Sequence, residues 1–397
     1  MDATALHPPP LSPESKPKTN WRSVLGIAGW VVGGATIGLV LDRFLDLDDA
    51  PALGLLAAFL VSMWLHAVIH EAGHALAGLA VGLKPVAFGV GPLRLERTAS
   101  GWRFRWGGGI AGIGGFASML PPVDAVPRRR EQALYILGGP LSNLLLGVPA
   151  LLLSVPALLL ANAAPPGVWA ILGFGFGVAG LVAGVANLVP LKTAGWLSDG
   201  AHLLLLRRDP QGALDGFRVQ QLIQVSMDGQ RPRDWPAALL PEQPLPDPAT
   251  DSPWATADVQ LRLLAAIDRG EPERARTCAR WMAARWPHAA PYDRPGIALS
   301  MAEHAAQIED DLELLRAWRP LGQGGLLDLS CHEAWLDAEI ALREGRNAEA
   351  RTLLSAARDA LPCVHDGGTR TAVAEQLDVL ETRLATAVGT LSSAAKG

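Results

Sequence analysis

The chain has 397 residues, a length that suggests at least two domains. Residues 1–200 carry 24 of the 73 charged side chains and residues 201–397 carry the other 49, so only the second half has the composition of a soluble domain. The net charge of −5 offers no basic surface, which speaks against nucleic acid as a partner.

Long uncharged stretches predict a polytopic membrane domain. Glu71 is the only charged residue between Asp49 and Lys84, and no charge occurs in residues 132–191. That second stretch is interrupted at 162–167 by Asn-Ala-Ala-Pro-Pro-Gly, which is typical of a turn. Because a spanning helix needs about 20 apolar residues, we expect four transmembrane helices, at 23–41, 50–83, 132–161 and 168–189.

The placement of Lys and Arg predicts the orientation of these helices. Lys16, Lys18 and Arg22 precede the first helix, and the loop 84–131 holds eight basic residues against three acidic ones. The loop 42–49, by contrast, is acidic. We therefore expect both termini in the cytoplasm, with the second helix running from outside to inside.

A small β-hairpin is expected in the loop between the second and third helices. Residues 86–98 and 102–106 are strand-like and flank the turn Ala99-Ser100-Gly101. In the second segment Arg103 and Arg105 alternate with aromatic residues. The position of this hairpin between the two helices suggests that the hairpin, with its Gly-rich continuation, dips toward the candidate site on the second helix that is described next.

The motif His70-Glu71-Ala72-Gly73-His74 lies inside the second apolar stretch. Residues i and i+4 share one face of a helix, so His70 and His74 can direct ring nitrogens at one Zn²⁺. Glu71, next to the first ligand, can serve as the general base toward a water molecule. His66, four residues before His70, shares its face and is interpreted as a packing histidine or one that contacts a ligand.

A third ligand is needed, since catalytic zinc sites usually have three protein ligands and a water. After the fourth helix, which ends in Asn187-Leu188-Val189-Pro190, a polar turn leads to Ser198-Asp199-Gly200. The predicted orientation places Asp199 on the cytoplasmic side, at the depth of His70 and His74. His202, three residues further on, is an alternative ligand.

These elements resemble the site-2 protease family of intramembrane zinc metalloproteases. The matching elements cover residues 50–205: the His70 to His74 motif, the stretch Gly138-Gly139-Pro140-Leu141-Ser142-Asn143, and the set Asn187, Pro190, Asp199 and Gly200. One departure is the loop 192–196, which lengthens the usual spacing between the Asn and the Asp.

The resemblance implies a role for each matching residue. His70, His74 and Asp199 would be the zinc ligands and Glu71 the catalytic base. Asn187 would bind substrate near the scissile peptide, and Asn143 would lie in the same surroundings.

The second half is predicted to be a soluble α-helical, tetratricopeptide-like domain. Residues 263–287 align with 338–362, so that Gly270 matches Gly345 at the turn between two helices. The offset of 75 residues is not a multiple of the usual repeat of about 34. Such arrays usually bind peptides or proteins, so a protein partner is expected here, with a purely structural cap as the alternative.

The fold is therefore expected to be mainly α. We divide it into a polar cytoplasmic N-terminus (1–22), a membrane-embedded zinc protease domain (23–210), a Pro-rich linker (211–257) and a cytoplasmic α-helical repeat-like domain (258–397).

The predicted function is that of an intramembrane zinc endopeptidase in the lipid bilayer. It would cut a transmembrane segment of a membrane protein, a single-span anchor by the family resemblance, near the cytoplasmic face. The expected location is the inner (plasma) membrane of a bacterium. Two alternatives remain: a zinc peptidase that trims short or secreted peptides, and a catalytically inert scaffold that recruits partners through its helical tail.

Overall fold

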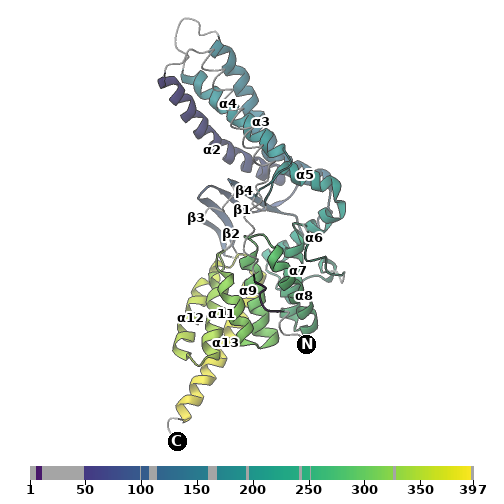
Figure 1. The fold of residues 1–397 in the computed structure, drawn as a ribbon, viewed down its shortest axis with the longest axis vertical. Coiled ribbons are helices and arrows are strands. Elements are labelled where there is room, and N and C mark those ends of the chain that lie inside the picture. Colours follow the sequence, from purple (N-terminus) through teal and green to yellow (C-terminus); the bar gives the residue numbers. More distant parts are fainter. Residues whose placement is uncertain are drawn as a thin grey trace.

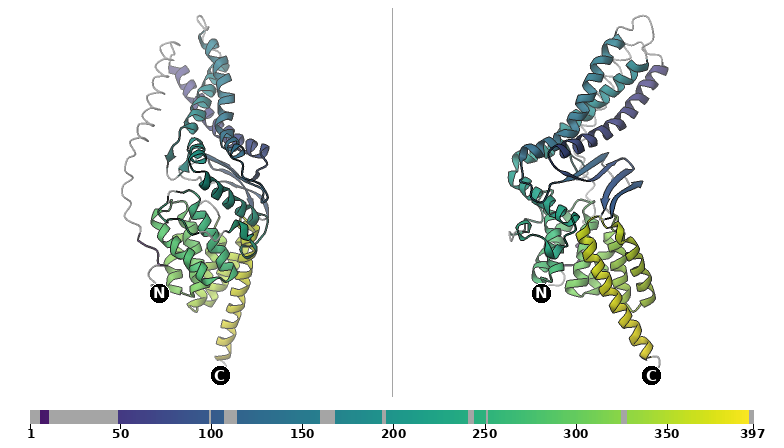
Figure 2. Two further views of the ribbon diagram at one scale, coloured as in Figure 1. Left: turned by 90° about the vertical axis from the view of Figure 1, so that its right-hand side faces the viewer. Right: turned by 180° about the vertical axis from the view of Figure 1, so that it is seen from behind.

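The computed structural model describes residues 6–10, 49–98, 100–106, 114–159, 168–193, 196–240, 244–250, 252–324 and 328–394. These residues form a bundle of long apolar helices, a four-stranded sheet and a larger helical domain (Figure 1). The sheet lies between the bundle and the helical domain in each view (Figure 2). The mainly α class predicted from the sequence is confirmed.

The bundle consists of α2 (Asp49–Ala80), α3 (Arg129–Leu159) and α4 (Val168–Leu188). Among the described residues, two segments are long and apolar enough to cross a membrane, Arg129–Ala157 in α3 and Val168–Leu188 in α4. The predicted segment 50–83 is helical as α2, and its crossing of a membrane stays a prediction. The predicted helix 23–41 lies outside the described residues.

The outer faces of these helices are apolar and exposed. Only 22 % of the most apolar window of α3 and 28 % of that of α4 is buried. Leu76, Leu145, Leu153 and Trp169 are between 68 % and 81 % exposed. A soluble protein rarely leaves so much contiguous apolar surface uncovered, so this surface fits contact with lipid.

The loop between α2 and α3 forms a four-stranded antiparallel sheet, which corrects the prediction of a single hairpin. Its strands are β1 (Lys84–Val90), β2 (Leu93–Thr98), β3 (Gly101–Trp106) and β4 (Gly115–Leu120), in the order β3-β2-β1-β4. The predicted hairpin is confirmed as β2–β3, where Thr98 pairs with Gly101. The predicted strand 86–98 is in fact two strands, because Gly91 (φ +58°) and Pro92 turn the chain.

The chain leaves α4 through the short strands β5 (Lys192–Thr193) and β6 (Trp196–Leu197), followed by α5 (Asp199–Arg208) and α6 (Pro210–Met227). The region predicted as a linker, 211–257, is thus helical in its first part. It continues through η2 (Pro232–Asp234) and η3 (Ala237–Leu239). The side-chain amide of Gln221 in α6 donates to the carbonyl oxygens of Val123 and Ala125, 2.8 and 2.9 Å away, and so fastens α6 to the segment after β4.

The C-terminal domain is helical, as predicted. Its helices are α7 (Ala255–Arg269), α8 (Pro272–Arg285), η4 (Trp286–His288), α9 (Arg294–His304), the π-helix η5 (Ala305–Glu309), α10 (Leu312–Trp318), η6 (Arg319–Gly322), α11 (Ser330–Arg343), α12 (Asn347–Ala360), η7 (Leu361–Cys363) and α13 (Gly367–Ala394). The aligned residues Gly270 and Gly345 have φ of +67° and +76° and turn the chain between α7 and α8 and between α11 and α12. Since α9 and α10 lie between these pairs in the chain, an offset of 75 residues corresponds to two helix pairs. The tetratricopeptide classification itself stays a prediction.

The N-terminal segment packs into the same helical domain. Leu6 is buried in the main hydrophobic core, 9 % exposed. Its carbonyl oxygen accepts a hydrogen bond of 2.8 Å from the indole N–H of Trp318. The start of the chain is therefore held on the side of the molecule that carries the C-terminal domain.

Ion pairs join the sheet to the helical domain. Glu96 of β2, 4 % exposed, lies 3.2 Å from Nε2 of His365. Arg103 and Arg105 of β3 lie 3.7 and 4.0 Å from the carboxylate of Asp328, just before α11. These contacts attach the sheet to the domain below it.

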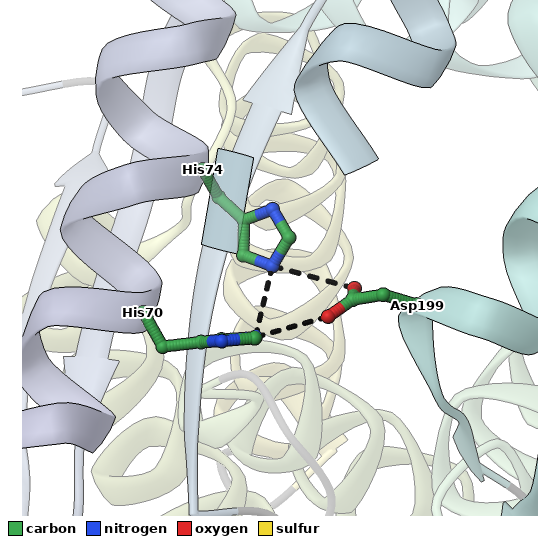
Figure 3. A group of neighbouring side chains, drawn as sticks. All are labelled: His70, His74 and Asp199. Atoms are coloured by element: carbon green, nitrogen blue, oxygen red, sulfur yellow. Dashed lines mark hydrogen bonds and ion pairs between the residues drawn. The ribbon is translucent and has the colours of Figure 1, made fainter. Parts of the chain in front are cut away.

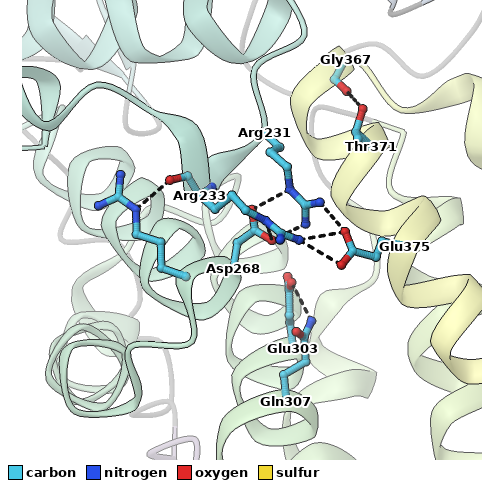
Figure 4. A network of polar contacts seen from close by, with 9 residues as sticks. Arg231, Arg233, Asp268, Glu303, Gln307, Gly367, Thr371 and Glu375 are labelled. Carbon is cyan, nitrogen blue, oxygen red and sulfur yellow. Dashed lines mark hydrogen bonds and ion pairs between the residues drawn. The ribbon is translucent and has the colours of Figure 1, made fainter.

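A second network ties the segment after α6 to two helices of the domain (Figure 4). The guanidinium of Arg231 binds both carboxylate oxygens of Asp268 at the end of α7 and also contacts Glu375 of α13. Arg233 donates to the two oxygens of Glu375 over 2.9 and 2.8 Å. The network thus links segments that are more than 100 residues apart in sequence.

Candidate active site

Three potential metal ligands meet where α2 approaches the start of α5 (Figure 3). Nε2 of His70 and Nε2 of His74 are 3.1 Å apart, and oxygens of Asp199 lie 3.0 and 3.3 Å from them. All three ligand atoms lie within 4.8 Å of one another. Two imidazoles and one carboxylate that converge in this way are a donor set of the kind that holds Zn²⁺ in catalytic sites, so the residues fit this metal.

The surroundings keep Asp199 ionised. Burial alone would raise the pKa of its carboxyl, but the close contacts with the imidazoles of His70 and His74 outweigh burial and lower this pKa to about 2. Asp199 is therefore a carboxylate at neutral pH, which is the form that binds a metal ion.

Ser198 fixes the position of Asp199 at the first turn of α5. Its Oγ donates to the carbonyl oxygen of Val189 (2.6 Å) and accepts from the backbone N–H of Ala201 (3.2 Å). It thereby caps α5 and attaches its first turn to the end of α4. Gly200 permits this close approach, because a Cβ there would lie 1.9 Å from a carbonyl oxygen at the end of α4.

Gly139 of α3 lies against the imidazole rings of His70 and His74. A Cβ at this position would lie 2.4 Å from Nε2 of His74 and 2.7 Å from Nε2 of His70. Any side chain here would therefore compete with a metal ion for the space in front of the two nitrogens. This is the physical reason for a glycine in the Gly138 to Asn143 stretch.

Each imidazole is held by a second contact on its Nδ1 atom. Nδ1 of His74 donates to the carbonyl oxygen of Tyr135 over 2.8 Å. Nδ1 of His70 lies 3.2 Å from the amide of Asn143, which in turn lies 3.1 Å from Nδ1 of His66. Such contacts orient ligating imidazoles and set which ring nitrogen is bare.

Glu71 lies between the ligand pair and the sheet. Its side chain packs against Gly115, the first residue of β4, where a Cβ would be 2.8 Å from Oε1. Glu71 is 8 % exposed, as are His70 and His74. The carboxylate therefore sits inside the site, next to a strand that forms one edge of the described sheet.

Residues 58–162 match the model of Peptidase family M50, the family of the site-2 proteases. Over this stretch the chain is similar to the M50 peptidases. No curated protein and no solved structure matches it. This match confirms the resemblance seen in the sequence and, together with the converging metal ligands, identifies the protein as a metallopeptidase. The matched region contains His70, Glu71 and His74 but ends before Asp199, whose place in the site rests on the geometry.

The site brings together five of the six residues singled out in the sequence, all except Asn187. His70, His74 and Asp199 converge and Glu71 lies beside them. Asn187 is half-buried in the last turn of α4, and its amide nitrogen donates to the carbonyl of Ala183, one turn earlier. A substrate-binding role for Asn187 stays a prediction.

Asn143, the fifth of these residues, is fully buried between two imidazoles. Its burial favours a role inside the site over direct contact with a peptide. His202, considered as a ligand, is not part of the cluster that the described residues form. One pattern in the sequence indicates the partner of Asn143: His66 lies one turn before His70, on the same helix face.

Proposed function

We propose that this M50 peptidase is a membrane-embedded zinc endopeptidase that cuts a transmembrane segment of another protein near the cytoplasmic face. The observation that carries the proposal is the place of the metal site. His70 and His74 belong to α2, a helix of the apolar bundle. The sheet and α5, whose first residue is Asp199, lie where the bundle meets the helical domain (Figure 1). This position suits a peptide bond close to the membrane boundary.

The residues of the site have distinct tasks in peptide hydrolysis. His70, His74 and Asp199 would hold zinc, which when bound supplies Lewis-acid activation of the scissile carbonyl and of water. Glu71 takes a proton from the attacking water and passes it to the leaving amine. The low exposure of Glu71 keeps bulk water away from this transfer.

The edge of the sheet offers a place for the substrate. Within the described sheet β4 pairs with β1 only, and its first residue, Gly115, contacts Glu71. A transmembrane helix hides its peptide bonds in internal hydrogen bonds, so the substrate must unwind before it is cut. Pairing of the unwound segment with β4 would satisfy its backbone groups and present one peptide bond beside Glu71.

The contact of Leu6 with Trp318 supports the predicted topology. It holds the N-terminal segment on the side of the C-terminal domain. If α2, α3 and α4 each cross the membrane, Asp49 and the C-terminal domain lie on opposite sides of it. The N-terminal segment lies on the side of the C-terminal domain, so an odd number of further crossings must separate residue 10 from residue 49. This parity supports one crossing at 23–41, with both termini in the cytoplasm. The bacterial inner membrane remains the proposed location, and a protein partner for the helical domain remains a prediction.

A reconstituted system tests the proposed function. The full-length protein in proteoliposomes is given a single-span substrate with helix-weakening residues near its cytoplasmic end, and the same segment as a soluble peptide. We expect cleavage of the membrane substrate that requires one zinc per chain and is absent in Glu71→Gln. Cleavage of the soluble peptide alone would indicate a trimming peptidase. Metal-free protein without activity, yet with intact partner binding, would indicate a scaffold.

Natural substrates can be found by comparing the membrane proteomes of cells with the wild-type protein and with Glu71→Gln. Uncut single-span proteins should accumulate in the variant only. If no membrane protein differs between the two, the proposed substrate class is wrong.

A further inference from the structure

The two imidazoles of the site obtain their orientation in different ways. Nδ1 of His74 faces the backbone carbonyl oxygen of Tyr135 over 2.8 Å. A carbonyl only accepts, so Nδ1 of His74 carries the ring proton and Nε2 is bare, as a metal ligand must be. Nδ1 of His70 instead faces the side-chain amide of Asn143, which has a donor end and an acceptor end. The direction of this amide determines which ring nitrogen of His70 carries the proton, and therefore whether Nε2 can bind a metal ion.

In the direction that the structure shows, the amide nitrogen of Asn143 faces His70 and the amide oxygen faces His66. Nδ1 of a neutral His70 would then accept, and the ring proton would sit on Nε2, where the metal must bind. Nδ1 of a neutral His66 would then donate to the amide oxygen. Nε2 of His66, without a proton, would lie 3.0 Å from the carbonyl oxygen of Phe176, so that two hydrogen-bond acceptors would face each other. A turn of the amide by 180° removes both conflicts.

We propose that His66 and Asn143 are positioning residues that set His70 for metal binding. Nε2–H of His66 donates to the carbonyl of Phe176, so Nδ1 of His66 accepts from the amide N–H of Asn143. Oδ1 of Asn143 then accepts Nδ1–H of His70, and Nε2 of His70 is left bare for the metal. The proposal rests on the zinc site of the proposed function.

The packing around His66 confines this chain of hydrogen bonds to partners within the protein. His66 and Asn143 are both 0 % exposed, and buried polar groups of this kind find their partners within the protein. The His66 ring lies against Phe176 with centroids 4.3 Å apart. Gly180 provides the space for it, since a Cβ there would lie 2.5 Å from Cε1 of His66.

Zinc affinity tests the proposal without use of catalytic activity. Metal-free full-length protein in detergent is titrated with Zn²⁺ against a chromophoric chelator, for the wild type, Asn143→Leu, Asn143→Asp, His66→Leu and the double variant His66→Leu/Asn143→Asp. Asn143→Leu should weaken zinc binding by about 10- to 100-fold, as does loss of other groups that orient ligating histidines. Asn143→Asp should keep binding within a few-fold, because a carboxylate also accepts from Nδ1–H of His70.

The double variant separates orientation from packing. His66→Leu alone should weaken zinc binding by about 10-fold, because the amide of Asn143 can then turn the wrong way. Added to Asn143→Asp, the same change should cost no affinity, because both oxygens of a carboxylate accept. An equal loss in both backgrounds would show that His66 acts through packing alone and would overturn the proposal, as would a loss of binding in Asn143→Asp.

Two further measurements keep the result interpretable. His66→Asn retains an acceptor near the position of Nδ1 and should restore most of the affinity that His66→Leu loses, even if His66→Leu lowers the thermal stability. A wild-type protein that binds no zinc would contradict the proposed function. A wild-type protein that binds zinc, with no coupling between residues 66 and 143, would contradict only the present inference.

Discussion

The indole ring of Trp196 stacks on the phenol ring of Tyr292, with centroids 4.1 Å apart and planes inclined by 22°. Trp196 belongs to β6, three residues before Asp199, and Tyr292 lies between η4 and α9 of the helical domain. The stack therefore connects the C-terminal domain to the segment that carries the third metal ligand. In this way the helical domain contributes to the geometry of a site in the membrane-facing part.

Removal of the Tyr292 ring should lower peptidase activity without removing a ligand. An aromatic pair contributes about 0.5–1.5 kcal/mol beyond the area it buries, so Tyr292→Ala should reduce kcat/KM by roughly 2- to 10-fold through a looser Asp199. Tyr292→Phe keeps the ring and serves as the control. Equal activity of the Ala and Phe variants would show that the stack does not position the ligand.

Replacement of Glu71 should abolish hydrolysis and leave metal binding intact. Glu71 lies beside the ligands but is not one of the three converging groups. Loss of a general base typically costs about 10²- to 10⁴-fold in rate, so Glu71→Gln should show that loss in single-turnover cleavage. Zinc content, measured by atomic absorption, should stay near one per chain. Loss of zinc from this variant would mean that Glu71 helps to hold the metal.

A methyl group at Gly139 should exclude the metal. The Cβ of Gly139→Ala would enter the space in front of Nε2 of His70 and His74. We expect loss of zinc and of activity, although alanine is the better helix former. Gly296→Ala in α9 is the matched control, because its Cβ meets only the flexible amide of Gln260 at 3.3 Å. Zinc retention by Gly139→Ala would place the metal elsewhere.

Loss of the Arg231 network should lower the stability of the fold more than loss of exposed ion pairs does. The side chains of Arg231 and Asp268 are 13 % and 8 % exposed. Breaking a buried ion pair costs up to about 3–5 kcal/mol, and Arg233 would remain as the second partner of Asp268. Arg231→Leu should therefore lower the melting temperature in thermal unfolding. Arg358→Leu, which breaks exposed pairs with Asp378 and Glu381, should change it little. Equal shifts would contradict this ranking.

Glu303 should make the stability of the helical domain depend on pH. Burial, together with the nearby charge of Asp268, raises the pKa of Glu303 to about 7 from an ordinary value of 4.5. Because the folded state holds this proton more tightly, its stabilising contribution is complete below about pH 4.5 and is lost as the pH rises to about 7. The full difference is up to about 3 kcal/mol. Glu303→Gln should match the wild type near pH 4.5 and exceed it in melting temperature at pH 8; parallel curves would contradict the assignment.

The local spacing of residues in the sequence was enough to predict much of the candidate site. His70 and His74 could be placed on one helix face because the α-helix has a fixed period, and Asp199 followed from the charge pattern of the loops. The partners of these ligands could not be derived in that way. The contact of Asn143 with His66 joins two helices, and the stack of Trp196 on Tyr292 joins two domains. Because each contact joins segments that are far apart in the sequence, no periodic pattern of residues indicates it.

The fold was predictable where the hydrophobic pattern is long and less so where it is short. The helices α2, α3 and α4 follow from apolar stretches, and the C-terminal helices from the repeated Gly turns. The sheet was underestimated because the turn Gly91-Pro92 inside residues 86–98 is too short to divide two strands by its pattern alone. Strand β4 was missed because it follows a Gly-rich segment and consists of only six residues.

The burial of Leu6 in the core of the helical domain has a consequence for how the protein is made. Trp318, which binds its carbonyl group, is synthesised 312 residues later. The segment around Leu6 therefore cannot complete its packing until most of the polypeptide has been synthesised. Closure of this core is therefore a late event that depends on completion of the C-terminal domain. A bulky tag fused at the start of the chain would interfere with a fold that is finished at its far end.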